Sequence, residues 1–155
     1  MPAAQLLPIL QQERAHVSSF LALLLTEAPL IGGAEDLEAL GAVTEQKQAL
    51  AAELSAVGTQ RDAWLSANGF EAGFAGMQAA CNTYPALAPV WAEVTEQAQQ
   101  ASQQNLQNGA LIDAHLRDTT ESISALRNLQ GGGAPIYDAL GRTRNGGNRR
   151  AIAAG

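Results

Sequence analysis

Apolar residues recur at alternating steps of three and four over three long stretches, the spacing that gathers side chains on one stripe of an α-helix. The first stretch ends at EAPLIGG, where Pro29 and two glycines break the pattern. The second follows Glu35 and Asp36, and the third runs from Pro85 to about Leu129. The stripes are Leu6, Leu10, Glu13, Val17, Phe20 and Leu24; Leu40, Val43, Lys47, Leu50, Leu54, Val57, Arg61 and Trp64; and Leu87, Trp91, Val94, Ala98, Ala101, Asn105, Asn108 and Ile112.

These patterns predict an all-α fold, an antiparallel bundle of three long, coiled-coil-like helices. A short amphipathic piece with Phe70, Phe74 and Met77 predicts a short helix before the last long one. We expect a helical bundle domain at residues 1–130 and a flexible, Gly/Arg-rich tail with a short Ile-Tyr motif at residues 131–155. Three glycines start this tail, and its later glycines and asparagines bury too little surface to order themselves.

Polar residues interrupt the predicted seams. Asn105 and Asn108 fall on the third stripe, where a buried asparagine costs stability but sets helix register. Gly109 would let a neighbouring helix approach closely. Lys47 and Arg61 are expected to lay their stems along the seam while their charges reach water. We therefore predict a structural polar seam made of these five residues.

Composition and charge favour a helical protein that does not bind nucleic acid as its main partner. The 155 residues are 46% hydrophobic but only 5% aromatic, as in long helices. Residues 1–130 carry five Lys/Arg and 14 Asp/Glu, a net charge of −9, which argues against nucleic acid as the main partner. Four arginines in the tail are typical of a solvated segment; if they bound nucleic acid, the binding would collapse with salt.

Candidate chemistry is sparse. The single cysteine, Cys81, cannot form an internal disulfide, and His16 and His115 lie far apart without acid, base or metal spacing. The GGGAP stretch lacks the lysine of a phosphate-binding loop. We therefore expect that the protein has no enzymatic activity and binds no metal or cofactor. The N-terminus has no basic leader, and the run FLALLLTEAPLI is too short to span a bilayer, which predicts a cytoplasmic protein without membrane insertion.

The last part of the third stretch is rich in leucine and isoleucine, at Leu111, Ile112, Leu116, Ile123, Leu126 and Leu129. Spacing alone allows two interpretations of these residues. They are core if other helices cover them, and a groove for a partner's amphipathic helix if they are uncovered. The apolar island PIYDAL in the tail has two interpretations as well, a segment folded back on the bundle or a free linear motif.

Several motifs carry a family resemblance. NLQNGALI, at residues 105–112, is followed some twenty residues later by PIYDALGRT, and TEQKQALAAEL with Arg61 beyond it lies in the second stretch. In this order and spacing they resemble the FlgN-type flagellar export chaperones. Two positions depart from the family's tail pattern: Asp138 stands where glycine is frequent, and Arg142 stands where glutamine is common.

The resemblance implies a cytoplasmic chaperone of flagellar type III export, a monomer or weak homodimer. Such chaperones bind the C-terminal helical segments of hook-filament junction proteins, prevent premature assembly and deliver them to the membrane export gate. By the same resemblance, the six leucine and isoleucine residues named above, Leu111 to Leu129, would form the client surface. Ile136, Tyr137 and Gly141 would form the motif that docks on the export gate. The alternative is a non-catalytic coiled-coil adaptor that oligomerises through the same stripe.

Overall fold

The computed structural model describes residues 2–33, 36–129, 136–137 and 143–144. The chain divides into two compact units, Met1–Asn108 and Gly109–Gly155. The sequence instead predicts a domain boundary after residue 130, and that boundary stays a prediction. The described elements are α1 (Ala3–Glu27), η1 (Ala28–Leu30), α2 (Leu37–Ala67), α3 (Phe74–Thr83), η3 (Pro85–Leu87), α4 (Ala88–Leu129), β1 (Ile136–Tyr137) and β2 (Thr143–Arg144).

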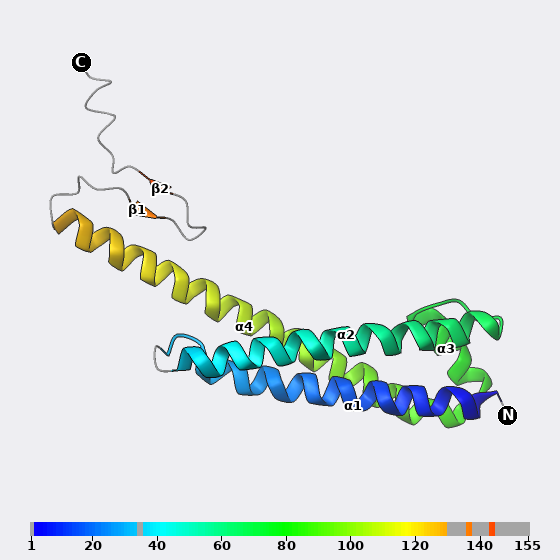
Figure 1. Ribbon diagram of the computed structural model, residues 1–155. Coiled ribbons are helices and arrows are strands. Elements are labelled where there is room, and N and C mark those ends of the chain that lie inside the picture. The colour runs from blue at the N-terminus through cyan, green and yellow to red at the C-terminus, as the bar shows by residue number, and fades with distance from the viewer. Residues whose placement is uncertain (1, 34–35, 130–135, 138–142, 145–155) are drawn as a thin grey trace, which may run out of the picture. The chain divides into compact units, whose positions relative to one another are not determined.

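Helices α1 and α2 lie side by side in opposite directions (Figure 1). Two ion pairs define their register: Lys47 with Glu27 at the end of α1, and Arg61 with Glu13 near the middle of α1. Helix α1 ends at Glu27 because Pro29 cannot donate a backbone hydrogen bond. Helix α2 ends at Ala67, before a turn that uses Gly69 at φ 83°.

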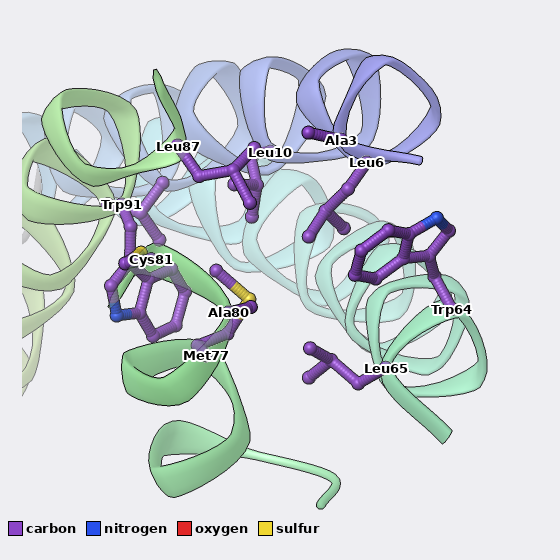
Figure 2. Close-up of a cluster of buried hydrophobic side chains, with 11 residues drawn as sticks. Ala3, Leu6, Leu10, Trp64, Leu65, Met77, Ala80, Cys81, Leu87 and Trp91 are labelled. Atoms are coloured by element: carbon purple, nitrogen blue, oxygen red, sulfur yellow. The ribbon is translucent and has the colours of Figure 1, made fainter. Parts of the chain in front are cut away.

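The core of the first unit gathers where α1, α2, α3 and the start of α4 meet (Figure 2). Leu6, Leu65, Met77 and Leu87 are fully buried there, one from each of α1, α2, α3 and η3. Trp91 brings α4 into the same cluster. The short helix predicted from the apolar residues near Met77 is therefore α3, and it contributes to the core.

Within the first unit, α4 runs in the same direction as α1. Arg14 Nη1 lies 3.0 Å from Glu93 Oε2, and Asn108 Nδ2 donates to the Leu24 carbonyl at 2.8 Å. The predicted all-helical class is confirmed for the described residues, apart from the two-residue strands. The bundle of three long helices through residue 130 stays a prediction, because α4 shares a unit with α1 and α2 only as far as Asn108.

The two strands of the second unit pair antiparallel, Ile136 with Arg144 and Tyr137 with Thr143. They account for four residues of the predicted flexible tail. The remainder of residues 131–155, including Gly141, lies outside the described residues. The flexibility of the tail therefore stays a prediction.

Candidate functional site

Large apolar side chains are exposed along the second part of α4. All six residues predicted as the client surface are in this group: Leu111, Ile112, Leu116, Ile123, Leu126 and Leu129. Their exposed fractions range from 37% for Ile112 to 83% for Leu129. We call these six residues the α4 stripe. Several large apolar side chains exposed on one helix typically mark an interaction site.

The α4 stripe has the geometry of a helix-binding face. At about 100° per residue its members fall within one side of the helix, and the 18 steps from Leu111 to Leu129 span about 27 Å. His115 and Thr119 lie on the same side by spacing and are also exposed. An amphipathic partner helix of similar length can therefore cover the leucine and isoleucine side chains at both ends of the stripe, with His115 and Thr119 between them.

A polar layer of the first unit lies at the end of α1. Glu27, which is 3% exposed, accepts hydrogen bonds from Lys47 Nζ at 3.2 Å and from Asn108 Nδ2 at 2.9 Å. Asn108 is itself buried and also accepts from Gln104 Nε2 at 2.9 Å. Side chains from α1, α2 and α4 meet here. The amide thus holds α4 against the last turn of α1 through Leu24 and Glu27.

Asn105 lies at the exposed edge of this layer. Its side chain is exposed, and its Oδ1 lies 3.4 Å from Lys47 Nζ. The expectation that both asparagines are buried on the seam is wrong for Asn105. A step of three residues rotates the side chain by about 60° around the helix, enough to move it from the seam to its edge.

A second polar layer lies two heptads away on α1 and α2. Arg61 pairs with Glu13 and with Asp62 Oδ1 at 3.2 Å, and its guanidinium lies 5.3 Å from the centre of the Trp91 ring. Desolvation raises the pKa of Glu13, and Arg61 only partly offsets this effect. Asp62 Oδ1 also accepts the Gly73 amide at 3.1 Å, which ties the start of α3 to this layer.

These two layers correct the expectation for the seam cations. Lys47 and Arg61 were predicted to extend their charges into water, but both charged groups pair with buried carboxylates of α1. The physical reason is that Glu13 and Glu27 occupy stripe positions of α1 and need a cation when buried. Glu13 is a member of the predicted stripe. Glu27 lies three residues beyond its last member, Leu24, and continues the same spacing up to the break at Pro29.

Gly109 has a different environment from the one predicted. A Cβ added at this residue would meet no atom within 4 Å, so no close contact requires a glycine here. Helix α4 continues through it from Ala88 to Leu129. In the predicted docking motif, Ile136 and Tyr137 form β1, while Gly141 is not among the described residues.

The described residues offer little for catalysis. They contain no group of three or more His, Cys, Asp or Glu side chains placed to hold a metal ion. Cys81 is buried, and desolvation raises the pKa of its thiol, which disfavours the reactive thiolate. Among the described helices, none is both long and apolar enough to cross a membrane.

Comparison with protein families matches residues 1–145 to the family model described as FlgN protein. The chain belongs to the FlgN family. FlgN proteins are flagellar export chaperones, a family of chaperones rather than enzymes. The match covers both the first unit and the α4 stripe. No curated protein matches the chain, and no solved structure matches it.

Proposed function

We propose that this FlgN-family chain is a cytoplasmic export chaperone that binds the C-terminal helical segments of flagellar hook-filament junction proteins on the α4 stripe. The observation that carries this proposal is the exposure of all six stripe residues on one side of a single helix. Family membership supports the chaperone role. Bound clients are kept from premature assembly and delivered to the export gate.

The physical chemistry of the stripe suits reversible binding. Covering an apolar face of this length removes several hundred Å² from water, a gross gain on the order of 10 kcal/mol at about 25 cal/mol per Å². Ordering a disordered client segment and losing its rotational freedom consume much of that gain. The remaining affinity holds a client during transfer and still permits its release at the gate. No nucleotide is needed for this cycle.

Titration calorimetry with C-terminal peptides of the junction proteins tests the proposal. We expect saturable binding to the full chain and loss of at least tenfold in affinity in Leu116→Asp and Ile123→Asp. Leu106→Asp is a matched control, because Leu106 is 73% exposed on the same helix but lies about 150° from the centre of the stripe. Equal losses in all three variants, or no binding to any junction protein, would sink the proposal.

Delivery to the gate is proposed to use the tail motif of Ile136, Tyr137 and Gly141. We expect Tyr137→Ala to retain client affinity while capture of the chain by the membrane export-gate component falls. Loss of client binding in this variant would instead place Tyr137 in the client site.

The same stripe also suits the adaptor alternative, in which a second copy covers it. Analytical ultracentrifugation distinguishes the two functions. A chaperone is expected to be a monomer or weak dimer that Leu116→Asp leaves unchanged. A stable oligomer that Leu116→Asp dissociates would favour the adaptor.

A further inference from the structure

A second apolar surface lies in the first unit, in a groove between α1 and α2. The groove has a volume of about 480 Å³. Ala22, Leu23, Ala49 and Leu50 form its apolar lining, and four polar residues, Glu53 among them, line it as well. Ala22 and Ala49 are exposed, and the two leucines are half-buried. Small side chains on both helices leave room for the close approach of a third helix.

The ion pairs of the two polar layers determine which charged side chains of α2 remain beside this groove. The cations of α2 are Lys47 and Arg61, and both turn toward buried carboxylates of α1. The exposed acidic residues of α2 that remain are Glu38, Glu45 and Glu53, spaced by seven and eight residues. Such spacing places the three carboxylates on one side of α2, which is the side that lines the groove through Glu53.

Helix α1 does little to neutralise these carboxylates. Arg14 is paired with Glu93 of α4 at 3.0 Å. His16 Nδ1 lies 3.3 Å from Glu53 Oε2 at the edge of the groove and carries charge only when protonated. Burial of both α2 cations therefore leaves an apolar groove bordered by negative charge.

We propose that this groove is a second docking site, which binds a basic amphipathic helix of a partner protein. The apolar side of that helix packs on Leu23 and Leu50 between the two alanines, and its Lys or Arg side chains pair with Glu45 and Glu53. The site uses only residues of α1 and α2. It is separate from the α4 stripe and does not depend on the proposed client binding.

A designed peptide tests this site directly. The probe is a helix of about 14 residues, roughly 21 Å long, with leucine along one side and lysine or arginine elsewhere. A second peptide keeps the leucines and replaces every cation by glutamate. Titrations use the full chain carrying Leu116→Asp and Ile123→Asp, so that the α4 stripe does not compete for the probe.

We expect one basic peptide to bind per chain and the acidic peptide not to bind. Ala49→Gln fills the groove without changing its charge and should weaken binding at least tenfold. Ala22→Gln makes the same test from α1, should Ala49→Gln prove unfolded by circular dichroism. Ala51→Gln is the matched control, since Ala51 is exposed on α2 but does not line the groove.

The electrostatic part is tested by Glu45→Gln with Glu53→Gln, which should weaken binding roughly three- to tenfold at low salt. Glu96→Gln removes a charge from an exposed site on α4 and should leave the affinity unchanged. An equal effect of Glu96→Gln and the groove variants would show unspecific attraction to an acidic protein and overturn the proposal. Equal binding of the acidic peptide, or no saturable binding of the basic one, would overturn it as well.

Discussion

Helix α4 contains one region whose apolar side chains are buried and another whose apolar side chains are exposed. Up to Asn108, its stripe positions Trp91, Val94 and Ala101 are buried in the first unit. Beyond Gly109, leucines and isoleucines at comparable helical spacing are between 37% and 83% exposed. The more hydrophobic region is thus the exposed one. Hydrophobicity decides what a helix can bury, but the presence of neighbouring helices decides what it does bury.

The sharpest test of this contrast compares truncations in the two regions. Trp91→Ala removes a large side chain from the core cluster and should lower the free energy of unfolding by about 3–5 kcal/mol. Leu116→Ala removes an exposed side chain and should change it by less than about 0.5 kcal/mol. Urea unfolding measures both. Comparable losses would mean that the α4 stripe is packed in solution, against the proposed client surface.

Substitutions in the polar layer at Glu13 should lower the free energy of unfolding almost as much. Arg61→Met leaves the buried Glu13 carboxylate without its cation, which should cost about 3 kcal/mol in unfolding free energy. Lys47→Met should cost less, about 1–2 kcal/mol, because Glu27 keeps the hydrogen bond from Asn108. A larger loss for Lys47→Met than for Arg61→Met would contradict this ranking.

Asn108 is buried and Asn105 is exposed, so their substitution should affect stability differently. Asn108→Leu should lower the free energy of unfolding by about 1–2 kcal/mol, since Glu27 and the Leu24 carbonyl lose a buried donor. Asn105→Leu should change it by less than about 0.5 kcal/mol, because its side chain is exposed. Thermal unfolding of the two variants gives the comparison. Equal effects would show that the asparagines share one environment.

The smallest expected effect is in the pH dependence of Glu13. Its pKa is raised in the folded state, so between the unfolded and folded pKa values the folded protein binds more protons. The stability that Glu13 contributes is full below the unfolded pKa and is lost as pH rises through the folded one. The stability of the wild type relative to Glu13→Gln should therefore fall as the pH rises above the unfolded pKa of about 4.

Urea titrations of both proteins across that pH range check the sign. A simple exposed ion pair with Arg61 would behave in the opposite way and gain stability as the carboxylate ionises. A rise in relative stability with pH would mean that the pairing with Arg61 outweighs the cost of burying Glu13.

The α4 stripe shows what helical spacing in a sequence cannot predict. Its six residues were identified by spacing, yet spacing left open whether they were core or surface. Helical period reports which side chains share a face, not whether another helix lies against that face. The groove between α1 and α2 gave no sequence signal at all, because Ala22 and Ala49 resemble many other alanines in the chain.

The sequence by itself determined the local structure and the family. Periodicity placed the long helices, proline and glycine placed their ends, and the motifs around NLQNGALI indicated the FlgN family that the comparison confirms. These are short-range properties, set by backbone preference and side-chain spacing. Only the tertiary structure decided that Lys47 and Arg61 turn inward, that Asn105 is exposed and that Asn108 is buried. Those outcomes depend on which helix lies opposite each side chain, a long-range contact that no local pattern encodes.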